Sequence, residues 1–217
     1  MRWVNKRWLS LALSILVSGF VWTGYAQTNL FTDVSEEDWF YETVDWAVSH
    51  QLIQGYPDGT FQPGANITEA EFLALLFRLV NLEAVQFNIE RHGGDIWKKR
   101  VMLALEQAKS PVEEGEYWAH QIYSASESLN LAVKEKSARN QPITRGEAAI
   151  MLAKLLSSQT FTEERAVQYL LDSGLSKGKL EATYAGFQAE AWLTRAEAIT
   201  FLKRLDSPIN RPQVSLH

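Results

Sequence analysis

The chain has 217 residues, with 21 basic and 26 acidic side chains, no cysteine and a hydrophobic share of 46%. This length suits one ordinary domain or a few small repeated ones, and the apolar content excludes wholesale disorder. Without cysteine there is no disulfide scaffold, no thiolate nucleophile, and no zinc or iron–sulfur site built on cysteine. A formal net charge of −5 argues against nucleic-acid binding, which usually requires a basic face.

Residues 1–26 have the layout of a secretory signal peptide. Arg2, Lys6 and Arg7 precede an apolar stretch at residues 9–21, and Gly-Tyr-Ala at residues 24–26 forms a small-x-small cleavage site. The apolar run is shorter than the roughly 20 residues that span a bilayer, which favours cleavage over an uncleaved membrane anchor. No later segment is apolar enough to span, so we expect a secreted protein. Its mature chain carries 18 basic and 26 acidic side chains.

Three later segments read alike, and each predicts the start of an amphipathic helix. Each has the motif Thr-x-x-Glu after an aliphatic residue, at residues 68–71, 144–147 and 194–197. Seven, eight and eleven positions after each threonine the residues are apolar, which is the spacing of one helix face. These apolar positions are Leu75, Leu76 and Leu79; Met151, Leu152 and Leu155; and Phe201, Leu202 and Leu205.

The Thr-x-x-Glu motif is also a capping box, which accounts for residues such as Thr144 and Glu147 as helix-start elements. Arg145 and Arg195 then fall at the first helical position, where a cation opposes the helix dipole at a cost of about 0.3–1 kcal/mol. Free N–H groups at a helix start favour anions, and arginine suits bidentate carboxylate recognition. The two arginines are therefore candidate binders of an acidic ligand. In the first segment the same position is Glu69, which would repel one.

A second helix is expected upstream of each capping box, so each copy is a helix–loop–helix unit. These early helices are expected near residues 39–52, 117–131 and 166–171. The predicted organisation is a signal peptide at residues 1–26, repeats at 27–85, 110–158 and 159–208, a connecting amphipathic helix at 86–109, and a flexible tail at 209–217.

The first copy also carries a signature of several fixed elements. These are Phe-Thr-Asp-Val at 31–34, Asp-Trp at 38–39, Gly-Tyr-Pro-Asp-Gly-Thr-Phe at 55–61 and Ile-Thr-Glu-Ala-Glu at 67–71. The combination closely resembles the S-layer homology (SLH) domain. Ile-Thr-Arg-Gly-Glu at 143–147 and Leu-Thr-Arg-Ala-Glu at 193–197 are similar to diverged members.

The resemblance implies an all-α fold in which three SLH repeats pack as a pseudo-threefold bundle with sugar-binding grooves between them. SLH modules hold proteins to a secondary cell-wall polysaccharide that carries pyruvate ketals. The resemblance therefore implies a location at the cell wall or cell surface, with this polymer and other envelope proteins as partners. It also implies that the motif arginine contacts the ketal carboxylate. The residues it nominates are Arg145 and Arg195 with their motif neighbours Thr144, Thr194, Glu147 and Glu197, the loop residues Gly55, Tyr56, Asp58 and Gly59, and the aromatic Trp39.

The copies depart from the family pattern in different places. The first has Glu69 where the arginine should be, the second lacks the glycine loop, and the third keeps Arg195 with Gly174 and Gly178. We therefore expect two competent grooves at most. The alternative interpretation is a degenerate SLH scaffold that acts as a secreted structural or protein-interaction module without binding polysaccharide.

An enzyme is the least favoured interpretation. The four histidines are scattered without a spacing that would hold a metal, and no Gly-x-Ser-x-Gly elbow is present. Neighbouring acidic residues such as Glu36, Glu37 and Asp38 are typical of a solvated helix start. We expect no catalytic residue, no metal and no cofactor.

Overall fold

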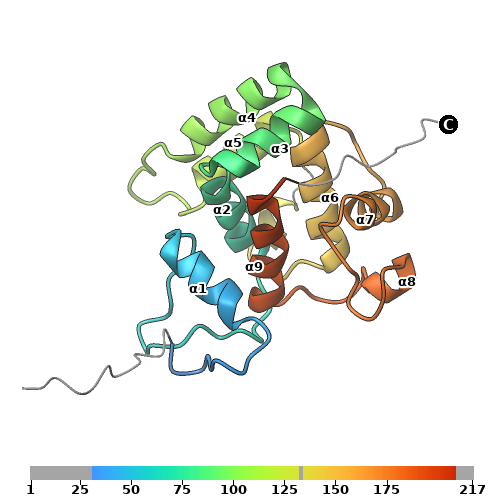
Figure 1. Cartoon of the computed structure of the whole chain (residues 1–217). Helices are drawn as coiled ribbons and strands as arrows, with labels where there is room; N and C mark the ends of the chain where they lie inside the picture. Colours follow the sequence, from blue (N-terminus) through green and yellow to red (C-terminus); the bar gives the residue numbers. More distant parts are fainter. Residues whose placement is uncertain (1–30, 132–133, 209–217) are drawn as a thin grey trace, which may run out of the picture.

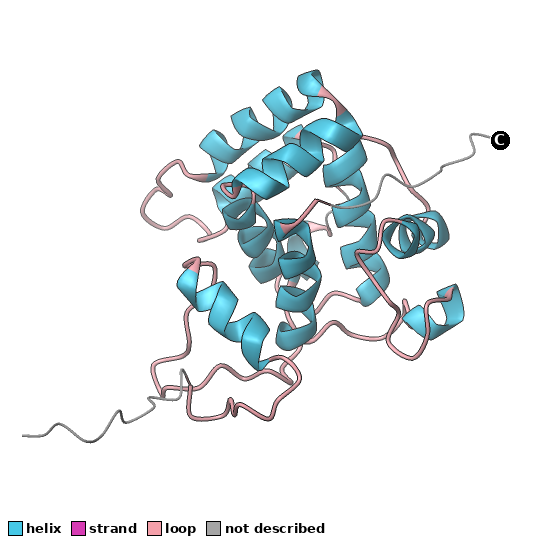
Figure 2. Cartoon of the chain, in the orientation of Figure 1, coloured by secondary structure: helices cyan, strands magenta, loops and turns pink. Residues whose placement is uncertain are grey.

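The computed structural model describes residues 31–131 and 134–208 (Figure 1). The expected signal peptide and C-terminal tail lie outside these described residues. Within them the chain forms helices and loops without a strand, which confirms the all-α prediction (Figure 2). The α-helices are α1 (Tyr41–Ser49), α2 (Glu69–Leu79), α3 (Glu83–Gly93), α4 (Asp95–Ala108), α5 (His120–Ser128), α6 (Arg145–Ser157), α7 (Glu163–Asp172), α8 (Tyr184–Phe187) and α9 (Arg195–Lys203). Two short 3₁₀ helices span Lys136–Ala138 and Arg204–Asp206.

Helices α2, α6 and α9 are the three predicted from the repeated motif, and each begins with the predicted capping box. In α6 the Thr144 hydroxyl oxygen accepts from the Glu147 backbone N–H at 3.1 Å, and the Glu147 carboxylate accepts from the Thr144 N–H at 2.8 Å. The predicted apolar positions of all three helices are buried. Capping and burial therefore act together, since propensity alone rarely holds such short helices.

A ring of backbone hydrogen bonds joins the three helix starts. The Ile67 N–H donates to the Leu193 carbonyl at 2.9 Å, the Leu193 N–H to the Ile143 carbonyl at 2.9 Å, and the Ile143 N–H to the Ile67 carbonyl at 3.1 Å. All three side chains are fully buried. Because each segment donates to one neighbour and accepts from the other, the three helix starts surround a common centre with approximate threefold arrangement.

The early helices complete this arrangement by packing on a different copy from their own. Helix α1 packs on α9, α5 packs on α2, and α7 packs on α6 (Figure 1). Each early helix therefore covers the late helix of the preceding copy, taken in cyclic order. The loops between early and late helices cross these boundaries, and they bring residues of two copies into each interface.

The prediction of one connecting helix at residues 86–109 is wrong. The chain turns back at Gly93 and Gly94, so α3 and α4 form a helical hairpin at the top of Figure 1, and the expected repeat boundary at residue 85 falls inside α3. Gly94 has φ 82°, a left-handed conformation that favours glycine. A Cβ at Gly93 would overlap the Trp97 ring and lie 2.8 Å from the Leu156 carbonyl oxygen. Both glycines are needed for the turn.

The hairpin packs against the rest of the molecule through α3 on α6 and α4 on α5. Trp97 is buried there, and its indole N–H donates to the Leu155 carbonyl at 2.7 Å. No single helix among residues 31–131 and 134–208 is long and apolar enough to cross a membrane; α2 and α3 satisfy the length and composition criteria only as a pair bent by 95°.

Candidate functional site: the grooves between copies

The two motif arginines lie inside the interfaces between copies. Arg145 is only 2% exposed. Its Nε donates to the Phe187 carbonyl at 2.9 Å, and its Nη1 lies 3.1 Å from a Glu197 carboxylate oxygen. The guanidinium also lies 4.8 Å and 4.9 Å from the ring centroids of Phe187 and Phe201. Burial lowers the pKa of Arg145, and the nearby Glu197 carboxylate opposes that shift. Arg145 therefore joins the second copy to the third.

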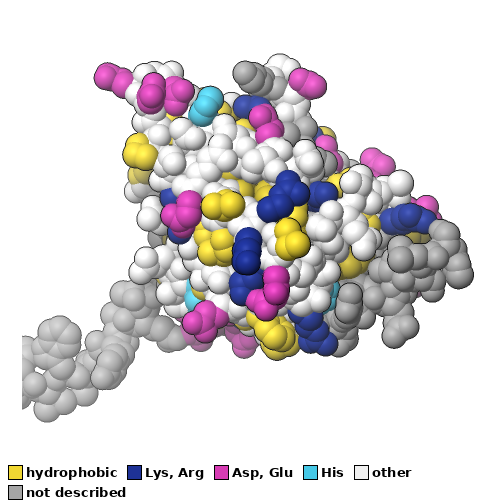
Figure 3. Space-filling view, turned by 90° about the horizontal axis from the view of Figure 1, so that it is seen from above, with side chains coloured by type: hydrophobic (Ala, Val, Ile, Leu, Met, Phe, Trp, Pro, Cys, Tyr) yellow, Lys and Arg dark blue, Asp and Glu magenta, His cyan; other side chains and the backbone are white. Residues whose placement is uncertain are grey.

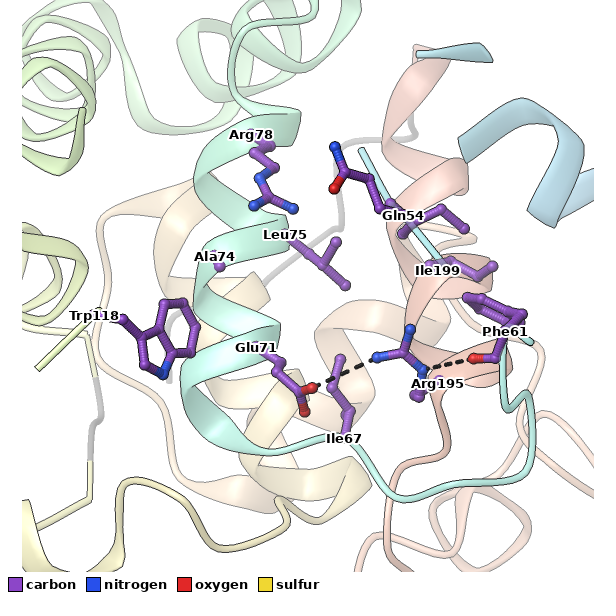
Figure 4. Close-up of a pocket in the computed structure, with 11 residues that line it drawn as sticks. Gln54, Phe61, Ile67, Glu71, Ala74, Leu75, Arg78, Trp118, Arg195 and Ile199 are labelled. Atoms are coloured by element: carbon purple, nitrogen blue, oxygen red, sulfur yellow. Dashed lines mark hydrogen bonds and ion pairs between the residues drawn. The ribbon is translucent and has the colours of Figure 1, made fainter. Parts of the chain in front are cut away.

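Arg195 repeats this arrangement between the third copy and the first (Figure 4). Its Nε donates to the Phe61 carbonyl at 3.0 Å, and its Nη1 lies 3.6 Å from the Glu71 carboxylate. Its guanidinium lies 4.9 Å from the Tyr56 ring centroid and 5.0 Å from that of Phe61. Each arginine thus binds the loop of the next copy and the capping-box glutamate of that copy.

The third interface has a carboxylate at the motif position that an arginine occupies in the other two. Glu69, in the arginine position, is 1% exposed and accepts from the Tyr123 hydroxyl at 2.9 Å and from the Lys134 backbone N–H at 2.8 Å. The Lys134 ammonium in turn lies 2.8 Å from the Glu147 carboxylate. A loop lysine supplies here the cation that arginine supplies elsewhere. Glu69 is a buried structural carboxylate, a role that its sequence position alone did not indicate.

Replacing Glu69 with glutamine is expected to flatten the pH dependence of stability above pH 4.5. Burial raises the pKa of Glu69 from its ordinary value of 4.5, and the negative charge of Glu147 adds to this, although hydrogen bonds from Lys134 and Tyr123 oppose it. The folded chain therefore holds this proton more tightly than the unfolded chain. The contribution of Glu69 to the free energy of unfolding is fully present below pH 4.5, and it is lost as the pH rises through the raised pKa of the folded state.

Thermal melts of the wild type and Glu69→Gln, followed by circular dichroism over a series of pH values, measure this difference. Between mildly acidic and neutral pH, the melting temperature of the variant should fall less than that of the wild type. Glu113→Gln is the matched control, because Glu113 is exposed. Identical slopes in the wild type and Glu69→Gln would contradict the assignment.

Two grooves at these interfaces contain a motif arginine. The larger, about 350 Å³, is here called the Arg145 groove, and it is lined by Trp39, Arg145, Gly178, Lys179, Glu197, Thr200, Phe201 and Arg204. The second, about 210 Å³, is the Arg195 groove, whose lining includes Arg195, Glu71, Arg78, Gln54, Phe61 and Trp118 (Figure 4). Each groove has one exposed tryptophan, with Trp39 66% and Trp118 50% exposed. Both tryptophans lie two residues before an early helix.

The charges of the Arg145 groove favour an anion. Arg145, Lys179 and Arg204 line it against the single carboxylate of Glu197. The Lys179 ammonium lies 3.3 Å from Glu197, and its side chain is 40% exposed, whereas that of Arg145 is 3% exposed. Lys179 is therefore the cation of this pair that a ligand can reach, and the partly exposed Arg204 adds a further positive charge. In a chain with excess acidic residues, such local positive charge decides where an anion can bind.

Lys179 was missed from the sequence because it lies in an irregular loop outside any motif. Its neighbour Gly178 has φ 75°, and a Cβ there would collide with the Glu181 carbonyl, so this turn requires glycine. Trp118 was also missed as a groove residue. Trp118, like Trp39, lies two residues before an early helix, and this shared position is a sequence signal that could have identified it.

The nominated loop residues of the first copy shape its backbone and are not among the residues that line the two grooves. The Asp58 carboxylate accepts from the Thr60 N–H at 2.9 Å and from the Thr60 hydroxyl at 2.7 Å. Gly59 has φ 82°, and a Cβ at Gly55 would overlap the Phe31 ring.

The other nominated residues have varied positions. Tyr56 covers the Arg195 guanidinium. Thr144 and Thr194 cap their helices, and Glu147 pairs with Lys134, while Glu197 lines the Arg145 groove. Within the described part of the chain no group of three or more His, Asp or Glu side chains could hold a metal ion.

Comparison with known proteins supports the resemblance. Residues 30–73 match the sequence model of the S-layer homology domain. The chain is 27% identical over 203 residues to the outer membrane protein SlpA of Thermus thermophilus, covering 90% of this chain and 20% of the relative. It is 26% identical over 197 residues to the S-layer protein EA1 of Bacillus anthracis (88% and 22% covered) and 24% identical over 210 residues to the S-layer protein of Bacillus licheniformis (92% and 22% covered). The chain spans about a fifth of the length of these relatives.

Proposed function

We propose that this chain, which carries an S-layer homology domain at residues 30–73, is a non-catalytic cell-surface anchoring module that holds an anionic cell-wall polysaccharide in the Arg145 groove. We also propose that residues 110–158 and 159–208 are diverged SLH repeats, so that each groove lies where the repeats meet. The observation that carries the proposal is the meeting of Lys179, Arg145 and Trp39 around one groove of about 350 Å³.

The groove supplies two kinds of contact that an acidic sugar needs. The exposed indole of Trp39 offers an apolar face to the C–H groups of a sugar ring. Lys179 offers an ammonium group that a carboxylate, such as that of a pyruvate ketal, can share with Glu197 or take from it. Arg145 adds positive charge behind Lys179, while its Nε and Nη1 stay bound to Phe187 and Glu197. In this chain Lys179 binds the anion and Arg145 positions the groove.

The Arg195 groove is a second and smaller site. Trp118 takes the place of Trp39 there, and Arg195 with Arg78 faces Glu71. The third interface offers no such site in this proposal, because the buried Glu69 carboxylate replaces the motif arginine there and Lys134 is already paired with Glu147. Two unequal grooves predict weaker binding than three intact ones would give.

One observation favours the alternative, a secreted scaffold that no longer binds polysaccharide. Both motif arginines are engaged inside the protein, by carbonyl oxygens, carboxylates and aromatic rings. If Lys179 and Trp39 do not suffice, the fold would persist without a ligand and would serve other envelope proteins as partners.

Sedimentation of residues 27–217 with purified cell walls tests the proposal. The protein should sediment with intact walls and remain in solution once the secondary polymer has been extracted. Lys179→Ala and Trp39→Ala should each weaken binding about tenfold, the loss expected for one well-placed contact. Their melting temperatures should stay close to that of the wild type, because both side chains are exposed.

Lys177→Ala is the matched control for Lys179→Ala. It removes the same charge from an exposed position two residues away that is not among the groove residues. If Lys177→Ala weakens wall binding as much as Lys179→Ala does, the polymer is attracted by the general positive charge of this loop and not by the groove. If the wild type is folded but does not sediment with walls, the anchoring function is wrong. The alternative of a scaffold that does not bind polysaccharide would then stand.

A further inference from the structure

The α3–α4 hairpin stands outside the ring of repeats and presents an exposed stripe to solvent, in which the Glu106 carboxylate lies 3.0 Å from the Lys109 ammonium of the same helix. On α4 the stripe consists of Ile96, Lys99, Leu103 and Glu106, whose spacing of three and four residues places them on one helix face. Ile96 is 80% and Leu103 is 72% exposed. Figure 3, seen from above Figure 1, looks onto the side where α3 and α4 lie and shows hydrophobic side chains among basic and acidic ones.

A shallow groove of about 620 Å³ runs along this stripe. It is lined by Glu90, Asp95, Lys98, Lys99, Met102, Leu103 and Glu106. A contiguous exposed apolar patch rimmed by polar residues marks an interaction site. None of the grooves between copies uses these residues.

The charge pattern of α4 is complementary to that of a second α4 helix that runs antiparallel to it. An antiparallel pair centred between Met102 and Leu103 would place Lys99 of each copy opposite Glu106 of the other, because the two are equally far from that centre. Asp95 would come within one residue of facing Lys109. A parallel pair in register would instead place like charges against each other. We propose that α4 is a docking surface for a second copy of this chain, paired antiparallel with the twofold axis between Met102 and Leu103.

The charges also select the register of this pair. Apolar contact alone would favour placing Ile96 opposite Leu103, but that register brings Lys99 against Arg100 of the second copy. Arg100 is held in place by the Ser128 carbonyl, at 3.1 Å, and by the Trp97 ring. The register centred between Met102 and Leu103 has no such repulsion and meets the self-complementary form that a twofold interface requires.

A membrane surface is a poorer occupant of the stripe. Asp95 and Glu106 lie beside Ile96 and Leu103, and an anionic bilayer would repel both carboxylates. Lys98 is already paired with Glu90, and Arg100 with the protein backbone, so little basic charge remains for lipid headgroups. A second copy, which carries both signs of charge, fits the stripe better.

Pairing would affect wall attachment through avidity. Two modules bound to one polymer make the second binding event intramolecular, which raises apparent affinity without new contacts. This consequence rests on the proposed function, whereas the pairing itself does not. Failure of wall binding would therefore leave the pairing intact.

Analytical ultracentrifugation of residues 27–217 over micromolar to roughly millimolar concentrations tests the pairing, with circular dichroism to confirm that each variant is folded. The wild type should dimerise reversibly, and Leu103→Glu should be monomeric throughout. Lys99→Glu and Glu106→Lys should each raise the dissociation constant at least about tenfold, since each turns two attractive pairs into repulsive ones. The double variant Lys99→Glu/Glu106→Lys should recover the wild-type constant, because its pairs are attractive again.

Leu180→Glu is the control, because Leu180 is 75% exposed on a loop away from the hairpin. A wild type that stays monomeric at every concentration would overturn the proposal. So would a dimer that Lys99→Glu leaves unchanged, or one that the double variant does not restore. Binding of a monomeric wild type to phosphatidylglycerol vesicles, lost in Leu103→Glu, would assign the stripe to a membrane instead.

Discussion

Replacing Arg145 with alanine is expected to lower the free energy of unfolding by about 3–5 kcal/mol, the usual cost of removing one partner from a buried ion pair. For a chain of this size that corresponds to a fall in melting temperature of roughly 6–20 °C. The loss has three sources. The Glu197 carboxylate loses its most deeply buried cation and keeps Lys179, the Phe187 carbonyl loses the donor Arg145 Nε, and a cavity opens between the rings of Phe187 and Phe201. Thermal melts of the purified variant measure it.

Lys179→Ala is the matched comparison, since it removes a cation from the same groove at an exposed position. It should lower wall binding with little change in melting temperature. Arg145→Ala should lower both, so loss of binding in that variant does not identify a ligand contact. An Arg145→Ala protein that melts like the wild type yet fails to bind walls would show that Arg145 acts on the ligand directly.

Replacing Ile143 with alanine is expected to lower the free energy of unfolding by about 2–5 kcal/mol, the range for deleting a large aliphatic side chain from a packed core. Ile143 is fully buried at the start of α6, and it both donates and accepts in the ring of hydrogen bonds. Ile67→Ala and Leu193→Ala should cost similar amounts, because those residues occupy the equivalent places. Chemical denaturation of the three variants gives the three free energies.

Ile96→Ala serves as the control in the same measurement, because Ile96 is largely exposed and its loss should cost less than about 0.5 kcal/mol. A large effect at one ring position with small effects at the other two would contradict the threefold arrangement of the centre. In that case a single copy would carry the stability of the core.

The sequence predicts the late helices of the fold well, because their signals are local. A capping box followed by apolar residues at helical spacing fixes where α2, α6 and α9 begin and which side is buried. The early helices α1, α5 and α7 were also expected near their observed places. These elements depend on periodicity and hydrogen bonds within a few residues.

The partners of these helices depend on distant residues and could not be predicted. Nothing local indicates that α1 packs on α9 or that Glu69 meets Lys134. The hairpin turn was missed although Gly93 and Gly94 stand side by side in the sequence, and a Gly-Gly pair is a signal for a turn that could have found it. The nomination of Arg145 rested on its motif, which carries no information on the Phe187 carbonyl and Phe201 ring that surround it.

The ring of hydrogen bonds at Ile67, Ile143 and Leu193 makes the cyclic order of the three copies a condition of folding. In an open solenoid each repeat contacts only its neighbours, and terminal repeats can fray without the rest. Here every copy is a neighbour of both others, and removal of one would leave buried N–H and carbonyl groups unpaired on the remaining two. The amide protons of the three residues should therefore exchange with solvent only through global unfolding, at a common rate. A groove residue of one copy can then be replaced while the backbone of that copy stays constrained by the other two.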